Sequence, residues 1–219
     1  MNASLILLVI VAALLAAGSM GCDDAESAGP ASVGADGDGM TLTDALTARR
    51  SVRRFKGDAL SPEQIATLCW AAQGVTDKRR GFRTAPSAGA LYPLELYVVT
   101  AAGVDHYDPK TGALTRHLEG DVRPSLQAAA LGQRFVGDAP ATFVLTAVIE
   151  RTTAKYGRRA ERYVWVEVGH AAQNLLLQAV ALKLGAVPIG AFDDAAVAKA
   201  LSLPADHAPA LLVPTGTPK

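Results

Sequence analysis

The hydrophobic pattern divides the chain at about residue 40. The first part holds a single apolar run, Leu5 to Ala17, followed by a polar stretch with no periodicity. From Thr41 onward, apolar residues recur every three to four positions, as on a helix face, or in short continuous runs, as in buried strands. Residues 41–219 are therefore expected to form one domain with a core of its own.

Helix signals recur through this second part. Ser61 and Pro62 supply a cap and a first-turn proline, and Gly74 ends the apolar face that follows them. Further helices are predicted over residues 122–131, 163–184 and 194–201, the last capped by Asp193. The long helix carries scarcely any charge beyond Glu167, which predicts that it is buried on most sides.

Strands are predicted between these helices. They cover residues 96–100, a hairpin of 104–107 and 113–117, a buried run at 141–149, and short apolar segments at 186–189 and 210–214. The hairpin breaks the strict alternation of strand and helix that a doubly wound nucleotide-binding fold requires. The predicted class is therefore α+β, with a mixed or antiparallel sheet flanked by helices.

Residues 1–22 are interpreted as a targeting signal rather than as part of the fold. Their apolar run of 13 residues is shorter than the ~20 that a membrane-spanning helix needs, and it suits the centre of a signal peptide. Small residues then lead to Cys22, as at a bacterial lipoprotein cleavage site. No Lys or Arg precedes the run, so a plain cleaved signal and an uncleaved anchor stay open. Export to the cell envelope, with a membrane tether through Cys22, is expected.

Residues 23–40 are interpreted as a flexible acidic linker. They hold five acids and no base, and they have too few apolar side chains to form a core. Without these acids, residues 41–219 carry 21 basic against 16 acidic side chains. The excess is concentrated at residues 49–56, which suits one anionic ligand better than the extended track that nucleic acid needs. Neither a nucleic-acid partner nor a metal site is predicted.

The basic cluster contains a candidate phosphate anchor. Arg49, Ser51 and Arg53 alternate along the chain, so an extended backbone would point all three side chains the same way. Two guanidinium groups and a hydroxyl could then bind one phosphate. The alternative is a solvated basic loop.

Two small-residue segments could lie against a flat ligand. Residues 83–94 are nearly free of bulk between Pro86 and Pro93, and residues 185–193 form another small-residue turn after a strand. Small side chains let backbone amides approach a ring or its chain closely. The alternative is a pair of tight structural turns without a ligand.

In this order and spacing, the three segments resemble the nitroreductase family. More narrowly they resemble its SagB-type subgroup of azoline dehydrogenases, which oxidise thiazolines and oxazolines in modified peptides. The run PSAGALYPLE is the most specific match, and the likeness extends over nearly all of residues 41–219. The resemblance implies a homodimer with FMN at the interface, and hydride transfer to flavin N5.

The resemblance also assigns individual positions to the flavin. It places Arg49, Ser51 and Arg53 on the FMN phosphate, Pro86, Ser87, Ala88 and Ala90 along the flavin in a loop that usually comes from the second subunit, and Ile189, Gly190 and Ala191 beside the ring near N5. In many relatives the positions of Ala90 and Tyr92 hold Asn and Gln, so their side-chain hydrogen bonds to the flavin are missing here. Lys219 is a candidate for the basic residue with which relatives often reach the phosphate.

Lys155 and Tyr156 are the candidate catalytic residues. They match the Lys-Tyr pair that azoline-oxidising relatives use as a base. This role is chemically reasonable because a dehydrogenation must remove a proton as well as a hydride. The alternative is that the two residues simply open a helix.

Other conspicuous side chains are expected to be structural. Cys69 lies on an apolar helix face and is interpreted as buried packing. His170 is expected to be packed and hydrogen-bonded, with Glu167 one helical turn before it as its partner. Trp70 and Trp165 are assigned to the core.

The expected function is that of an FMN-dependent oxidoreductase acting on azoline-type rings in a peptide or related small molecule. One alternative is an NAD(P)H-dependent reductase of nitro compounds or quinones. The other is a non-catalytic flavin-binding protein of the envelope, because an exported domain has no supply of NAD(P)H.

Overall fold

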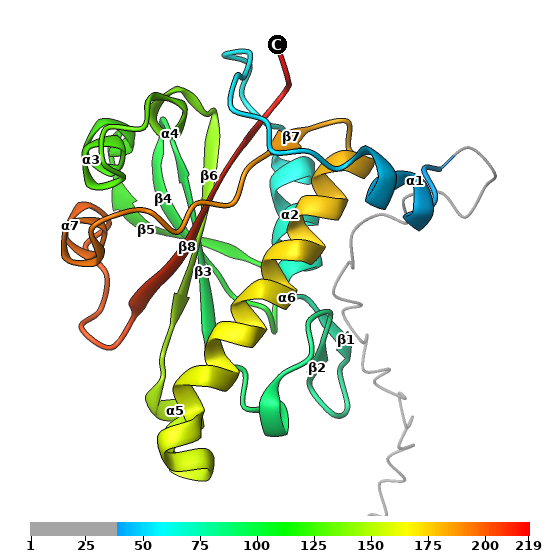
Figure 1. Cartoon of the computed structure of the whole chain (residues 1–219), viewed down its shortest axis with the longest axis vertical. Coiled ribbons are helices and arrows are strands. Elements are labelled where there is room, and N and C mark those ends of the chain that lie inside the picture. Colours follow the sequence, from blue (N-terminus) through cyan, green and yellow to red (C-terminus); the bar gives the residue numbers. More distant parts are fainter. Residues whose placement is uncertain (1–38) are drawn as a thin grey trace, which may run out of the picture.

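The computed structural model describes residues 39–219 (Figure 1). The predicted signal and almost all of the predicted linker lie outside the described residues. Within residues 39–219, no helix is both long enough and apolar enough to cross a membrane.

A six-stranded antiparallel sheet forms the centre of the domain, in the order β5-β4-β3-β6-β8-β7. Its strands are β3 (Leu94–Thr100), β4 (Gly103–Tyr107), β5 (Leu114–Glu119), β6 (Ala141–Ala147), β7 (Gly185–Ala186) and β8 (Ala208–Gly216). A separate small hairpin joins β1 (Val75–Asp77) to β2 (Phe82–Arg83). The predicted α+β class with an antiparallel sheet is confirmed.

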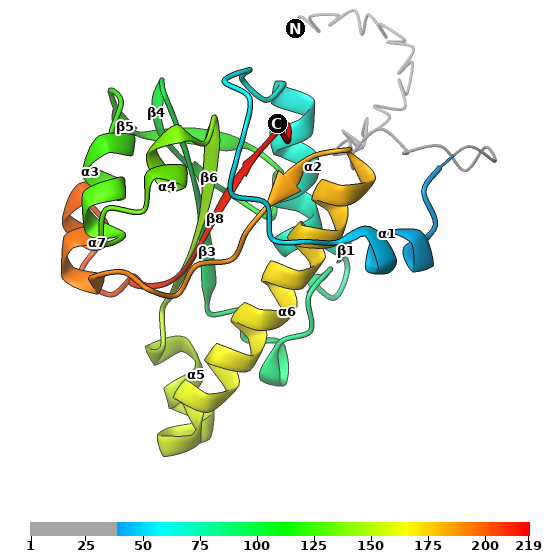
Figure 2. The same cartoon turned by 45° about the horizontal axis from the view of Figure 1, so that its top comes forward.

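Helices cover both faces of this sheet (Figures 1 and 2). They are α1 (Leu42–Ala48), α2 (Pro62–Gln73), α3 (Arg123–Ala129), α4 (Arg134–Asp138), α5 (Glu150–Tyr156), α6 (Ala160–Ala181) and α7 (Asp194–Ala200), with short 3-10 turns η1 (Ala88–Ala90) and η2 (Gly157–Arg159). Because side chains alternate along a strand, Leu96 and Val98 of β3 pack in the core shared with α2 and α6. Tyr97 and Val99 pack in a second core with α3, α4 and α7.

The helix signals in the sequence correspond to real caps. The Ser61 hydroxyl accepts from the Gln64 amide at 3.2 Å, and the Gln64 side chain accepts from the Ser61 amide at 2.9 Å. Asp193 caps α7 by accepting from the Ala196 amide at 2.8 Å. The predicted strand 141–149 is shorter in the structure, because its last residues lead into α5.

The prediction that the long helix is buried on most sides is wrong for the single chain. α6 has one buried stripe, and Trp165 is 41% exposed on the opposite side. Trp70 is half-buried, so neither tryptophan is fully in the core. Cys69, by contrast, is fully buried as predicted.

Candidate active site

The predicted phosphate anchor lies in an extended segment against β7. Ser51 forms a parallel bridge with Ala186, and the Val52 amide donates to the Ala186 carbonyl at 3.1 Å. A Cβ atom on Gly185 would lie 2.7 Å from the Val52 side chain, so only glycine allows this approach. The anchor is therefore held to the strand that leads into the second small-residue turn.

The far end of the anchor pairs with the last residues of the sequence. The Lys56 amide donates to the Thr217 carbonyl at 2.8 Å, and the Lys219 amide donates to the Arg54 carbonyl at 3.1 Å. Lys219 therefore stands beside the anchor, as the sequence suggested for an additional basic residue.

The anchor arginines are available for an anion. No ion pair joins Arg49 or Arg53 to an acid among residues 39–219. The Arg53 guanidinium lies 5.8 Å from the centre of the Phe135 ring. The Arg50 guanidinium, by contrast, is already engaged, because it donates to the carbonyls of Thr47 and Arg49, at 2.9 and 2.8 Å.

The turn after β7 presents open backbone. Ile189 is buried and exchanges two hydrogen bonds with Leu212, at 2.8 and 3.0 Å. Gly190 and Ala191 are exposed, and a Cβ atom on Gly190 would meet nothing within 4 Å. The amides of both residues donate to no backbone carbonyl within residues 39–219. A flat ligand has room and two hydrogen-bond donors here.

The loop from Pro86 to Tyr92 is tightly wound. Gly89, Ala90 and Tyr92 have positive φ values of 64, 55 and 48°. Ser87 stabilises this conformation, because its hydroxyl accepts from the Tyr92 amide at 2.9 Å and its carbonyl accepts from the Ala90 amide at 3.0 Å. Two non-glycine residues in the left-handed region indicate strain of the kind found at functional sites.

Lys155 and Tyr156 lie directly against this loop. A Cβ atom on Gly89 would stand 2.8 Å from Lys155 Nζ and 2.9 Å from the Tyr156 hydroxyl oxygen. The structure thus brings the predicted catalytic pair and the predicted flavin loop together within one chain. The pair closes α5, before the turn at Gly157, so the alternative that it opens a helix is wrong.

Two residues that sequence reasoning missed hold α5 against the loop. Arg151 pairs with Glu95 at 2.6 Å and also donates to the Tyr92 carbonyl at 3.3 Å. Burial alone would raise the pKa of Glu95, but the hydrogen bonds from His106 and Arg151 hold that pKa at about 2. No local pattern marks these residues, because 56 positions separate the partners.

Glu167 lies on the buried side of the same loop. It is 2% exposed, and its Oε1 atom has no hydrogen-bond partner within the described chain. Burial raises the pKa of Glu167 to about 7, against the opposing influence of Ser87 and Arg83. His170 is exposed on α6, so the predicted His170–Glu167 pair is wrong. No Asp, Glu, Lys or Arg follows Glu167 in α6, and this position among apolar residues was the signal that could have revealed its burial.

The anchor and the loop lie at different ends of α6. In Figures 1 and 2, α5 stands at the start of α6 while β7 and the anchor stand at its far end. The segment that holds Arg49, Ser51 and Arg53 is bridged to β7, which leads into the 189–191 turn. The structure does not bring residues 86–90 of the same chain to this segment.

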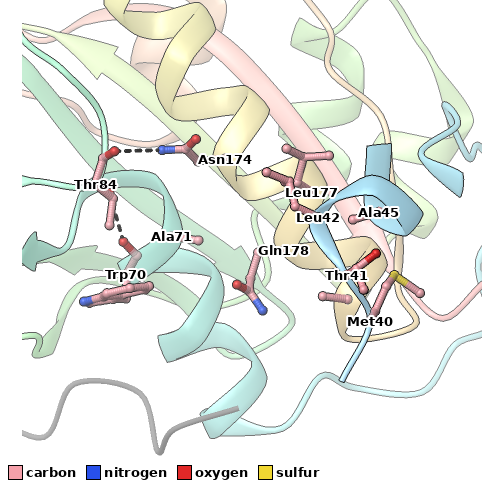
Figure 3. Close-up of a pocket in the computed structure, with 11 residues that line it drawn as sticks. Met40, Thr41, Leu42, Ala45, Trp70, Ala71, Thr84, Asn174, Leu177 and Gln178 are labelled. Carbon is pink, nitrogen blue, oxygen red and sulfur yellow. Dashed lines mark hydrogen bonds between the residues drawn. The ribbon is translucent and has the colours of Figure 1, made fainter. Parts of the chain in front are cut away.

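A pocket of about 310 Å³ opens between α1, α2 and α6 (Figure 3). One wall is fixed by Thr84, whose hydroxyl donates to the Trp70 carbonyl and whose carbonyl accepts from Asn174, both at 3.2 Å. Leu42 and Leu46 of α1 are 67% and 54% exposed beside it. This surface is largely apolar, and no other part of residues 39–219 covers it.

Solved structures establish the class of protein first. A nitroreductase-type structure from Ralstonia eutropha, 32% identical, matches with a TM-score of 0.76 over 83% of this chain and 84% of that chain. A chain of the Escherichia coli microcin synthetase McbBCD complex, solved with truncated pro-MccB17 bound, is 26% identical. It matches with a TM-score of 0.70 over 78% of this chain and 70% of that chain. The fold is the nitroreductase-like α+β fold.

Sequence comparison then defines the family. The profile of the nitroreductase family matches residues 46–217. A protein of Methanocaldococcus jannaschii, provisionally named a nitroreductase, is 43% identical over 183 residues, which cover 81% of this chain and 91% of that protein. The chain therefore belongs to the nitroreductase family.

Glu167 gives a testable dependence of stability on pH. Its pKa is raised from 4.5 to about 7 in the folded chain, so the folded state holds a proton that the unfolded state has released between these pH values. Stability is then lost as pH rises through this window, by up to about 3 kcal/mol. We expect Glu167→Gln to remove this loss, so that the variant gains stability relative to the wild type between pH 5 and pH 8.

Urea unfolding of both proteins at pH 5 and pH 8 measures this difference. Comparing the two proteins cancels the contributions of other titrating groups, such as His207, whose pKa is lowered by burial. If the variant and the wild type differ in unfolding free energy by the same amount at pH 5 and at pH 8, the buried, proton-binding role of Glu167 is contradicted.

Proposed function

We propose that the chain is an FMN-dependent oxidoreductase that dehydrogenates azoline-type rings. The observation that carries this proposal is the position of Lys155 Nζ and the Tyr156 hydroxyl against Gly89, in the loop assigned to the flavin. An amine and a phenol at one point beside a redox cofactor suit a reaction that removes a proton from carbon or nitrogen.

The residues present fit FMN. Arg49, Ser51 and Arg53 would hold its single terminal phosphate, since their segment is extended and the two guanidiniums are unpaired among residues 39–219. The open backbone at Gly190 and Ala191 would face its ring. A family structure from Desulfovibrio desulfuricans contains FMN. Bound FMN supplies the two-electron chemistry, and the protein supplies orientation and electrostatics.

In this proposal, residues of the chain itself accept the proton that the substrate loses. Lys155 Nζ or the Tyr156 hydroxyl takes it from the substrate, and the other group orients the acceptor. Arg151 holds their helix to the loop through Glu95 and the Tyr92 carbonyl. The rings of Tyr156 and Tyr163 pack in a T-shaped arrangement, with centroids 5.0 Å apart, which limits the movement of Tyr156.

A peptide substrate is supported by the likeness to a chain of the microcin synthetase complex, which was solved with a propeptide bound. The proposed export and lipid tether through Cys22 rest on residues outside the described part of the chain, and they stay predictions. An NAD(P)H-dependent reductase is the competing activity.

Spectroscopy of the purified protein separates these activities. The flavin absorbance near 450 nm should bleach when a thiazoline-containing peptide is added without oxygen, and the peptide should lose two mass units as it becomes a thiazole. Bleaching by NADPH with no change in the peptide would overturn the dehydrogenase proposal in favour of a reductase. If neither the peptide nor NADPH bleaches the flavin, the protein is a non-catalytic flavin-binding protein.

A homodimer is the proposed assembly. The loop at residues 86–90 and the anchor lie apart in one chain, and the apolar surface of α1 is uncovered by the rest of residues 39–219. A second copy would both complete the site and cover that surface. Light scattering should therefore give twice the monomer mass. Leu42→Glu/Leu46→Glu should raise the dimer dissociation constant at least ~10-fold, since two exposed leucines would be lost from the contact.

Leu131→Glu provides the matched control. This leucine is equally exposed but follows α3, on the opposite face of the sheet. A monomer that retains FMN, or equal weakening by the control, would contradict the proposed interface.

A further inference from the structure

A chain of direct side-chain contacts runs from β4 to α5, and it begins at His106. The centroid of the His106 ring lies 4.7 Å from that of Tyr97, and the Tyr97 hydroxyl lies 2.8 Å from His207 Nδ1. Tyr97 is only 2% exposed, so it forms a fixed surface that orients the His106 ring. His106 Nε2 then lies 2.8 Å from Glu95 Oε2.

The direction of the hydrogen bond between His106 and Glu95 follows from the charge of Glu95. Although burial opposes it, hydrogen bonds from His106 and Arg151 hold the pKa of Glu95 at about 2, so its carboxylate is ionised and can only accept. His106 Nε2 is therefore the protonated nitrogen that donates. This bond fixes one carboxylate oxygen, and only Oε1 is left for Arg151, at 2.6 Å.

Arg151 is shared between this carboxylate and the loop from Pro86 to Tyr92. Its Nη2 atom pairs with Glu95 Oε1, while its Nη1 atom donates to the Tyr92 carbonyl at 3.3 Å. A guanidinium and a carboxylate that are free to turn form two parallel hydrogen bonds with each other. Because His106 holds Oε2, Glu95 does not offer both oxygens, and Nη1 stays on the loop. The 3.3 Å contact is the longer of the two, so a turn of the guanidinium toward Glu95 would break it first.

The face of α5 that carries Arg151 also carries Lys155. The two residues are four positions apart in the helix, so their side chains project from the same side. Arg151 contacts the loop at Tyr92, and Lys155 Nζ and the Tyr156 hydroxyl lie against Gly89 of the same loop. The contact between Arg151 and the Tyr92 carbonyl therefore helps to set where the Lys155-Tyr156 pair stands on the loop.

We propose that His106 is a positioning residue that keeps α5 docked on this loop, because it prevents Glu95 from binding Arg151 through both oxygens. This rests on the proposed function, in which the Lys155-Tyr156 pair takes the proton from the substrate. His106 acts through Glu95 and Arg151 and touches none of the reacting groups. Its loss should therefore slow the chemical step and leave the binding of FMN and substrate unchanged.

Kinetics of the full-length, FMN-loaded protein with a thiazoline-containing peptide test this consequence. In His106→Leu, kcat should fall roughly tenfold, the scale of one lost hydrogen bond, while KM and the Kd for FMN stay within about twofold. His106→Gln places an amide N–H where Nε2 stands and should recover most of kcat. His117→Leu is the matched control, since His117 also packs on Tyr97, at 5.1 Å between centroids, but bonds to the carbonyls of Leu201 and Ser202. Its kcat should equal that of the wild type.

Hydrogen exchange followed by mass spectrometry separates this proposal from the proposed function, because it needs no turnover. The amides of residues 87–92 and 150–157 should exchange faster in His106→Leu than in the wild type, and at the wild-type rate in His106→Gln and His117→Leu. Faster exchange confined to His106→Leu supports the positioning role even if the wild type oxidises no azoline. Unchanged exchange in His106→Leu overturns it in either case.

The two measurements together cover the remaining outcomes. If the wild type oxidises the azoline and His106→Leu keeps its full kcat, the positioning role is overturned while the dehydrogenase proposal stands. Equal losses of kcat in His106→Leu and His117→Leu would show a general effect of repacking around Tyr97, and would also overturn the specific role of His106.

Discussion

Lys155→Ala is expected to lower the turnover of a thiazoline-containing peptide by ~10²–10⁴ while FMN affinity stays unchanged, the usual scale for loss of a general base. The physical reason is the place of Lys155 Nζ, beside the tightly wound loop at Gly89. Its helix, α5, lies at the opposite end of α6 from the phosphate anchor (Figure 1). The side chain is exposed apart from this contact, so its truncation should leave the free energy of unfolding nearly unchanged.

Three patterns of result distinguish the possible activities. If the protein is a dehydrogenase, Lys155→Ala should lose peptide oxidation activity. Lys199→Ala should lose less of this activity, and it controls for charge because Lys199 is an exposed lysine on α7. A reductase keeps NADPH-driven quinone reduction in both variants, because the hydride comes from the nucleotide and no such base is needed. Full azoline oxidation by Lys155→Ala would remove the catalytic assignment.

Arg49→Ala and Arg53→Ala should each weaken FMN binding by ~1.5–3 kcal/mol, the contribution of a hydrogen bond to a charged group. This corresponds to roughly a 10- to 150-fold rise in Kd. Both side chains are unpaired among the described residues and extend from a segment fixed to β7, so phosphate contact is their expected role. Titration of the apo-protein with FMN measures the change.

Arg50→Ala is the matched control for these variants. It stands between the two anchor arginines in the basic cluster, yet its guanidinium donates to the carbonyls of Thr47 and Arg49. Its loss should leave Kd within about twofold if geometry rather than net charge determines binding. An equal loss in all three variants would indicate a general electrostatic effect, and no loss in any would remove the anchor.

Local signals in the sequence predicted most of the fold. The cap at Ser61, the cap at Asp193 and the hairpin after β3 involve residues close together in sequence, so their patterns are visible without the fold. The limits of α6 were less accurate, since it begins and ends three residues earlier than predicted. Its first turn continues directly from η2, without a side-chain cap that would mark the start.

Within the candidate site, the sequence proposed only contiguous motifs. Residues 86–92 and the pair Lys155-Tyr156 were each proposed as separate motifs, but their contact at Gly89 depends on how α5 returns to the loop. The predicted pairing of Glu167 with His170 was wrong for the same reason. The spacing of apolar residues along a helix does not show which neighbouring element packs against each of its faces. Partners distant in sequence require the tertiary structure.

The pairing of Arg54 and Lys56 with residues 217–219 has a consequence for biosynthesis. More than 160 residues separate the partners, so a nascent chain that has not yet reached Thr217 lacks part of the framework that holds the basic segment. Long-range pairing of this kind forms late in folding because loop closure must precede it. We therefore expect a nascent chain that stops short of Thr217 to bind no flavin and to be colourless.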